Sequence, residues 1–172
     1  MTRPSPPSGA PPPQVVRLDD GATVALGPLV DVVADRYYHA YPDEHRRYGP
    51  VGREWCIHDN LYLLAWAYAA HRGDVRFEEQ VLWLARVLHS RSFPLDRLVH
   101  DLEIAADVVL EADVAEAEAV ADVLFEGAAV VQRYGEDCRR AERLAPPTRR
   151  CPSATRPPPR RPRRPRRTAR LR

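Results

Sequence analysis

The sequence predicts an all-α fold, an up-and-down helical bundle of four to five helices with a disordered Pro-rich N-terminus and an Arg/Pro-rich C-terminal tail. Apolar residues recur at three- and four-residue spacing through the middle of the chain, as in helices that bury one face. Prolines avoid this region, with six in residues 1–13, eight in residues 139–172 and only four between. Charge divides in the same way, because residues 139–172 hold 14 arginines and one acid, whereas residues 1–138 hold 12 arginines and 23 acids. The net charge of +2 is therefore the sum of an acidic domain and a basic tail.

These divisions give three segments. We expect residues 1–26 to be a mostly disordered leader, residues 27–135 a helical bundle domain, and residues 136–172 a disordered tail. All 26 basic residues are arginine, which can be written with GC-only codons, whereas lysine cannot. The gene is therefore inferred to have a high GC content. A wrong reading frame of such DNA also yields Arg/Pro-rich text, so the tail is either a selected sequence or the product of a frameshift.

The first expected elements are a short extended piece over residues 22–26 and a helix that begins at Gly27-Pro28. A proline in the first turn of a helix loses no hydrogen bond, because the first N–H groups have no partner within the helix. This helix is expected to end before Pro42, since the residue preceding a proline is pushed away from helical geometry. Its apolar stripe consists of Leu29, Val32, Val33, Tyr37 and Ala40.

Residues 41–52 read as a polar connector with a possible single helical turn over Asp43 to Arg47. A second helix is expected from residue 51 or 52 to His71, with Gly73 as its stop signal. Asp74 is the expected N-cap of a third helix. Its apolar positions are Phe77, Val81, Leu84 and Leu88.

Pro94 marks the start of a fourth helix, and a fifth spans roughly residues 113–133, with Gly135 expected to end it. Whether these two helices are separate or continuous through Ala112-Asp113 is open from the sequence. Gly127 lies inside the fifth helix, where glycine costs about 1 kcal/mol relative to alanine. A close crossing with another helix would explain its presence.

Several classes of protein are excluded. Every apolar run is broken by a charged residue or histidine well before the roughly 20 residues that a membrane span needs, so we expect no membrane partner. Residues 1–13 lack the apolar core of a secretory signal. Three widely spaced cysteines do not form a disulfide framework. We therefore expect a cytoplasmic protein.

The pattern predicts no catalytic residues, no metal and no cofactor. Glu54 and His58 share one helix face, but a bundle metal site needs a second such pair from another helix, and none occurs. His89 and His100 flank one predicted turn, where helix-end histidines are the simpler reading. Cys56 reads as a small packed apolar residue rather than a nucleophile.

Aromatic residues give the best indication of a binding surface. Ten of them fall between Tyr37 and Trp83, and the second helix is apolar over much of its circumference. Such a helix is either the centre of the bundle or one side of a pocket or dimer seam. The candidate ligand-binding residues are Trp55, His58, Asp59, Tyr62 and Trp66.

A family resemblance covers residues 36–110. The run includes Tyr48-Gly49, Gly52-Arg53, Cys56, His58-Asp59, Gly73-Asp74, Trp83-Leu84 and Pro94. It resembles the small all-helical sensor or cap-like modules of high-GC Gram-positive bacterial regulators, and is similar to the helical cap that precedes a cobalamin-binding domain in some sensors. The resemblance implies the type of module. It implies no binding residues, because the Glu/His positions that close over that cofactor have no match here.

The basic tail suggests a different partner. Arginines spaced by prolines would neutralise phosphates without reading sequence, so nucleic-acid association is expected if the tail is genuine. The residues concerned are Arg160, Arg161, Arg163, Arg164, Arg166 and Arg167. Attraction between the tail and the acidic domain is the competing hypothesis.

The leading hypothesis from the sequence is a non-enzymatic helical sensor or protein-interaction module in bacterial regulation, which binds another protein or forms a homodimer. A bundle that binds a small ligand or cofactor, and a protein that associates with nucleic acid through its tail, are the two alternatives.

Overall fold

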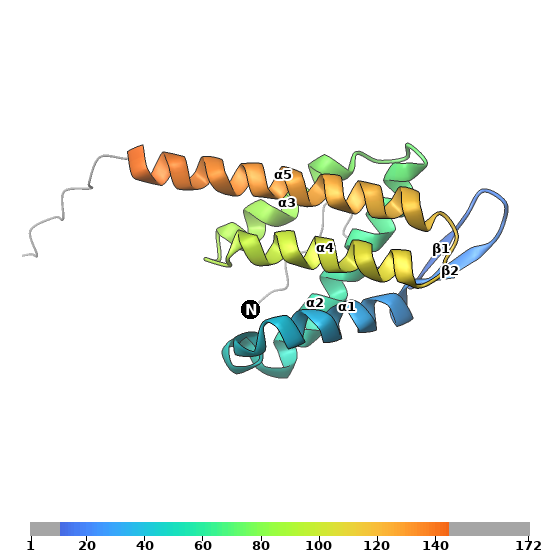
Figure 1. The fold of residues 1–172 in the computed structure, drawn as a ribbon, viewed down its shortest axis with the longest axis horizontal. Helices are drawn as coiled ribbons and strands as arrows, with labels where there is room; N and C mark the ends of the chain where they lie inside the picture. Colours follow the sequence, from blue (N-terminus) through green and yellow to red (C-terminus); the bar gives the residue numbers. More distant parts are fainter. Residues whose placement is uncertain (1–10, 145–172) are drawn as a thin grey trace, which may run out of the picture.

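A computed structural model describes residues 11–144. The all-α prediction is confirmed: five helices form a bundle, with a two-stranded hairpin at one end (Figure 1). The elements in chain order are β1 (Val15–Arg17), β2 (Thr23–Ala25), α1 (Leu26–Ala40), α2 (Pro42–His71), α3 (Phe77–His89), α4 (Leu95–Glu111) and α5 (Ala117–Leu144).

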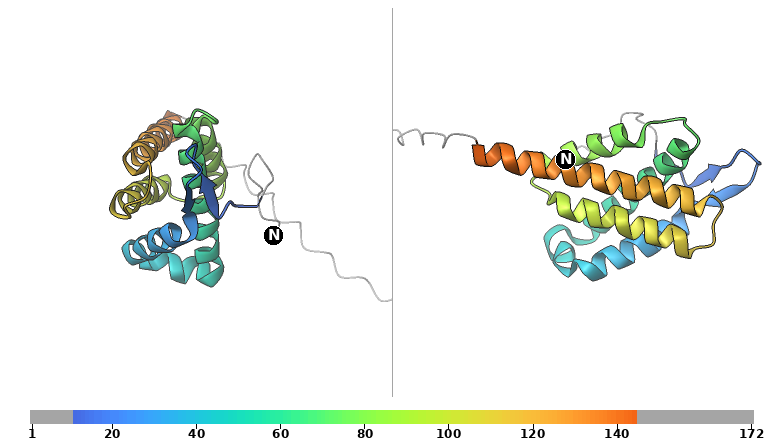
Figure 2. Two further views of the ribbon diagram at one scale, coloured as in Figure 1. Left: turned by 90° about the vertical axis from the view of Figure 1, so that its right-hand side faces the viewer. Right: turned by 45° about the horizontal axis from the view of Figure 1, so that its top comes forward.

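The helices form two layers. In the end view of Figure 2 (left), α1, α4 and α5 are stacked in one layer, and α2 and α3 form the second layer to their right. Helix α4 is the middle member of the first layer and packs against both α5 and α1. The core between the layers is continuous from the hairpin through all five helices. Its largest fully buried side chains include Tyr68, Leu63, Leu102 and Leu124.

The hairpin differs from the expected leader. The sequence predicts a mostly disordered segment up to residue 26, with a brief extended piece over 22–26. The structure instead pairs β1 with β2 in antiparallel register, with Val16 opposite Val24. Side chains in a strand point alternately to its two faces, and the middle residue of each strand, Val16 or Val24, is buried. Leu18, just after β1, is also buried in the core. Three apolar side chains therefore hold the hairpin against the bundle.

Helix α1 ends where Pro42 predicts, but α2 begins earlier than expected. Residues 42–48 are helical and precede a break at Gly49, whose φ of 63° and ψ of −162° are accessible essentially only to glycine. Pro50 follows directly and lacks the N–H that a continuous helix requires. The expected polar connector is thus a short helix joined to the long one by a kink.

The remaining turns follow glycine, proline and positive-φ residues. Gly73 has φ of 82° and ends α2, as predicted, with its N–H donated to the Ala70 carbonyl. Asp74 is not the N-cap of α3, which begins at Phe77 after Arg76. Pro94 precedes the first residue of α4. Helices α4 and α5 are separate, because residues 112–116 form a turn.

Helix α5 is longer than predicted, and Gly127 has the close crossing that its position suggests. A Cβ at residue 127 would overlap the ring of Phe77 on α3. Gly135 does not end the helix. It is buried, with Leu95 only 3.7 Å from the position of a Cβ, and α5 continues to Leu144. Gly127 therefore lets α3 approach α5 closely, whereas a side chain at Gly135 would meet only ordinary contacts.

Candidate functional site

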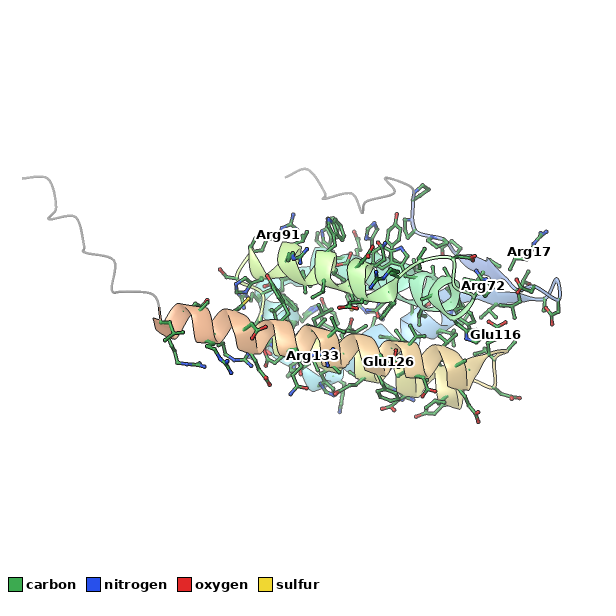
Figure 3. All side chains as sticks on the ribbon, turned by 90° about the horizontal axis from the view of Figure 1, so that it is seen from above. Arg17, Arg72, Arg91, Glu116, Glu126 and Arg133 are labelled. Carbon is green, nitrogen blue, oxygen red and sulfur yellow. The ribbon has the colours of Figure 1, made fainter. Side chains whose placement is uncertain are left out.

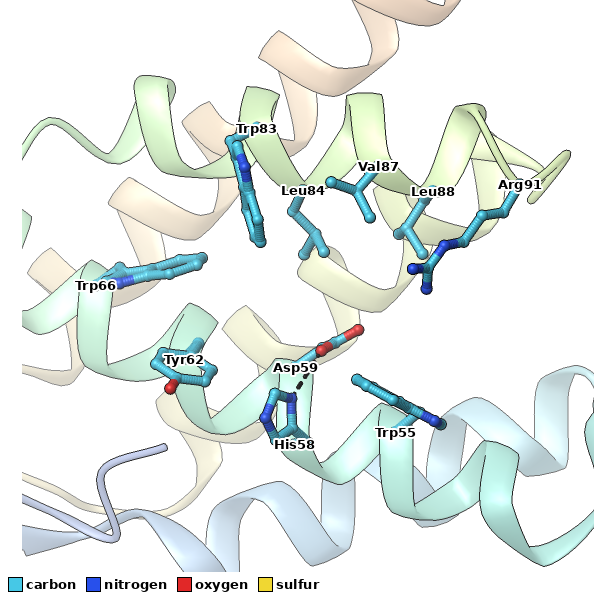
Figure 4. A pocket seen from close by; sticks show the side chains of 10 residues that line it. All are labelled: Trp55, His58, Asp59, Tyr62, Trp66, Trp83, Leu84, Val87, Leu88 and Arg91. Atoms are coloured by element: carbon cyan, nitrogen blue, oxygen red, sulfur yellow. Dashed lines mark hydrogen bonds and ion pairs between the residues drawn. The ribbon is translucent and has the colours of Figure 1, made fainter. Parts of the chain in front are cut away.

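The five candidate residues from the sequence lie together in the structure. All of them line one pocket between α2 and α3 (Figure 4). We call this pocket the aromatic groove. Helix α2 supplies Trp55, His58, Asp59, Tyr62 and Trp66, and α3 with its C-terminal turn supplies Trp83, Leu84, Val87, Leu88 and Arg91. The three tryptophans of the chain all line it.

Helical spacing explains the α2 wall of the groove. Residues 55, 58, 62 and 66 are separated by three, four and four positions, which stack side chains along one helix face. Their rings form a ladder, with centroid separations of 5.3 Å from Trp55 to His58, 5.2 Å from His58 to Tyr62, and 5.3 Å from Tyr62 to Trp66. Such tilted and edge-to-face contacts are the favoured geometries of aromatic pairs.

The α3 wall of the groove was not predicted from the sequence. Trp83, Val87 and Arg91 are spaced four residues apart, so this periodicity places them on one side of α3 and its C-terminal turn. The same spacing was visible in the sequence, but which helix faces α2 depends on tertiary packing. Figure 3, which views the bundle from above, labels Arg91 just beyond α3 and Arg72 just beyond α2.

The groove is shallow. Its cavity volume is about 30 Å³, whereas pockets for drug-sized ligands have roughly 300 Å³ or more. This space suffices for one or two water molecules, given that a water needs about 10–15 Å³. The surface therefore suits a flat or extended group that lies across the rings better than an enclosed cofactor.

A histidine–aspartate pair and a tyrosine hydroxyl lie among the rings. His58 Nδ1 and Asp59 Oδ1 are 3.0 Å apart, a distance that fits a hydrogen bond from the imidazole to the carboxylate. The Tyr62 side chain is only 5% exposed, and its hydroxyl has no hydrogen-bond partner among the described residues. In Figure 4 this hydroxyl points away from α3, toward the beginning of the described chain. A buried hydroxyl without a partner is unfavourable, which marks a position for an acceptor.

A buried polar network lies on another side of α2. Asn60 is fully buried and donates from Nδ2 to Asp101 on α4, at 3.0 and 3.2 Å, and to the Cys56 carbonyl at 3.1 Å. Burial raises the pKa of Asp101 to about 7, partly offset by the bond from Asn60. Asn60 Oδ1 and the hydroxyl of buried Tyr37 lack partners among the described residues.

A second polar cluster joins the start of α2 to α4. Arg97 donates to Asp43 at 2.8 Å and to Glu44, and its guanidinium lies 4.7 Å from the centre of the Tyr41 ring. Glu44 is buried, so this ion pair neutralises a charge inside the protein. The hydrogen bond from Arg97 lowers the pKa of Asp43. The sequence did not indicate this cluster, because Asp43 and Glu44 fall in the expected polar connector, far along the chain from Arg97.

The other candidates for chemistry have ordinary surroundings. Burial raises the pKa of the Cys56 thiol well above its usual value, which favours the unreactive protonated form. His89 packs against Tyr134, and His100 Nδ1 lies 2.8 Å from the Tyr41 hydroxyl. Glu54 is exposed. Within residues 11–144, no group of three histidine, cysteine, aspartate or glutamate side chains is arranged to hold a metal.

A larger and more open hollow of about 690 Å³ lies where α1, β2 and the turn after α4 meet. Its apolar lining includes Leu29, Val32 and Val108. Three charged residues line it, namely Arg36, Glu111 and Asp113, and the first two are paired with each other at 2.5 Å and 3.0 Å. The hollow therefore offers few polar groups that would orient a ligand.

The remaining sequence predictions concern other parts of the chain. The six arginines proposed to contact nucleic acid, Arg160 to Arg167, lie outside the described residues. The described part holds 24 acids and 14 arginines, which gives it a net charge of −10. Among its helices, none combines the length and apolarity that a membrane crossing requires.

Comparison with known proteins adds no relative, since no family model, no curated protein and no solved structure matches the chain.

Proposed function

We propose that this chain is a non-enzymatic helical interaction module, and that its aromatic groove binds an extended segment of a partner protein. The observation that carries this proposal is the convergence of three tryptophans, Tyr62 and Asp59 on one shallow groove. Tryptophan and tyrosine dominate the energy of protein interfaces, because they bury a large area and lose little conformational entropy. A regulatory or sensor role would operate through this binding.

The small volume of the groove and the negative net charge of residues 11–144 favour a peptide ligand over a cofactor or a nucleic acid. An enclosed cofactor needs roughly ten times the volume of the groove. Phosphates would meet a net charge of −10 on the bundle, so nucleic-acid association requires the arginines of the tail. That hypothesis has its own test: replacing Arg160, Arg161 and Arg163 by serine in the full chain should lower DNA affinity and reduce its salt dependence.

Three panels of peptides test the proposal by isothermal titration calorimetry. They are proline-rich extended peptides, amphipathic helical peptides, and charged extended peptides without proline. We expect an extended class to bind, and Trp83→Leu to weaken binding at least tenfold, as for a central interface tryptophan. Phe125→Leu is the control, since Phe125 is an exposed aromatic residue on α5.

Two results would overturn the proposal. One is an absence of binding in all three panels. The other is equal weakening by the two substitutions, which would place the contact outside the groove. Sedimentation velocity of the same protein tests for self-association, the alternative in which the partner is a second copy of the chain.

A further inference from the structure

We propose that the chain's own residues 1–10 occupy the aromatic groove, an inference that rests on the peptide-binding function proposed above. This segment reads Met-Thr-Arg-Pro-Ser-Pro-Pro-Ser-Gly-Ala and is followed by three more prolines. It lies outside the described residues, and its chemistry, its length and the place where the described chain begins support the proposal.

The chemistry of the segment matches the groove. Proline-rich sequences favour the polyproline II conformation, which has no internal hydrogen bonds and leaves every carbonyl oxygen available. Grooves lined by aromatic rings recognise this conformation, with the proline rings packed on the aromatic faces. The ladder from Trp55 to Trp66, faced by Trp83, is a surface of that kind.

The buried hydroxyl of Tyr62, which points toward the beginning of the described chain, provides a second and independent indication that a further segment lies along the α2 edge of the groove. It is shielded from solvent and has no acceptor among the described residues. A carbonyl of a polyproline II segment would accept its hydrogen bond. Arg3 is the only charged side chain among residues 1–10, and the charged residues that line the groove are Asp59 and Arg91. A guanidinium between a carboxylate and tryptophan faces gains from both charge and cation–π attraction.

The length and origin of the segment also fit. Strand β1 packs against α2, and in Figure 4 the beginning of the described chain passes below Tyr62. The α2 side of the groove, from Trp55 to Trp66, covers 12 residues of helix, or about 16 Å. Ten residues of polyproline II span about 31 Å. The leader is therefore long enough to reach along the whole ladder.

Because residues 1–10 are covalently attached to the bundle, they compete with a free peptide for the groove at a fixed effective concentration. A short flexible connection gives the leader an effective concentration of about 1 mM at the groove. For a peptide whose dissociation constant is about 0.1 mM, this concentration weakens the apparent affinity of a competing copy about tenfold.

The test uses the full chain and a synthetic peptide of residues 1–10, titrated while tryptophan emission is recorded. Emission reports on the groove, because all three tryptophans line it. The leader variant carries Pro4→Ser, Pro6→Ser and Pro7→Ser. The matched control carries Pro157→Ser, Pro158→Ser and Pro159→Ser, which make the same change in the tail.

We expect the leader variant to bind the peptide about tenfold more tightly than the unaltered chain and the control variant. Adding Trp83→Leu to the leader variant should remove this gain. Equal affinities in all three chains would overturn the inference, as would a leader variant that binds other extended peptides but not this one. In the latter case the proposed function stands, whereas a groove that binds no extended peptide contradicts both.

Discussion

Asp101 makes stability depend on pH in a direction opposite to that of most carboxylates. It is buried, and its pKa rises from 3.8 to about 7 because the ionised form is poorly solvated. Below pH 3.8 the side chain is protonated in both the folded and the unfolded chain, so no penalty arises. Between these values the unfolded chain loses the proton first, and stability falls. Above pH 7 the penalty is complete.

The magnitude follows from the shift. A difference of about three pKa units corresponds to roughly 4 kcal/mol, at 1.36 kcal/mol for each unit. Asp101→Asn removes the charge without changing the shape of the side chain. The amide oxygen of the new asparagine keeps one of the two acceptors that Asn60 Nδ2 has in Asp101. The variant should therefore be more stable than the unaltered chain at pH 8, by up to roughly 4 kcal/mol, and nearly equal to it at pH 4.

Urea unfolding followed by circular dichroism at half-unit steps from pH 4 to pH 8.5 measures this difference. Asp107→Asn is the control, since Asp107 is exposed on the same helix. Asp43 and Glu111 have lowered pKa values, so the stability that their ionised forms contribute is lost at acid pH. This loss is the same in the variant and in the unaltered chain. A difference in stability that stays constant with pH, or a loss of stability in Asp101→Asn at pH 8, would refute the reasoning.

Three further predictions concern packing and backbone. Arg97→Ala leaves the buried charge of Glu44 without its partner and should lower the free energy of unfolding by about 3 kcal/mol. Arg36→Ala breaks an exposed ion pair and should have a much smaller effect. Urea unfolding at pH 7 measures both. Gly127→Ala places a methyl group against Phe77 and should lower the free energy of unfolding by about 1–3 kcal/mol, while Gly135→Ala meets only ordinary contacts and should be neutral or slightly stabilising. Adding Phe77→Leu should restore the stability of Gly127→Ala, and a lack of rescue would show that the clash is not the cause. Gly49→Ala forces a side chain into a conformation reserved for glycine and should lower the melting temperature by an amount equivalent to about 1–3 kcal/mol, with Gly27→Ala, inside regular α1, as the comparison.

Helix stripes and most turns could be predicted because they depend on local sequence. Val81 and Leu84 repeat with helical spacing, and they are buried as expected. Gly73 ends α2 through a backbone conformation that few other residues adopt. The hairpin was harder to predict, since three-residue strands have too little periodicity to separate from a loop, and only burial against the helices makes them stable.

The polar interior could not be predicted from the sequence. Glu44, Asn60 and Asp101 carry side chains that are normally exposed, and nothing in their neighbours along the chain indicates burial. Their partners are distant in sequence: Asp101 is 41 residues from Asn60, and Arg97 is 53 residues from Glu44. The α2 half of the aromatic groove could be found from spacing alone, whereas the α3 half depends on how the two helices pack.

The buried network and the aromatic groove are coupled through the rotation of α2 about its own axis. Asn60 lies between Asp59 and Tyr62 in sequence, yet it faces α4 while those two residues line the groove beside α3. Rotating α2 by one residue, about 100°, would separate Asn60 from Asp101 and turn the ladder away from Trp83. Apolar packing alone tolerates such shifts better than a buried amide, because an unpaired polar group in the core is costly. The hydrogen bonds of Asn60 thus favour the single orientation of α2 in which Trp55, Tyr62 and Trp66 line the groove opposite Trp83.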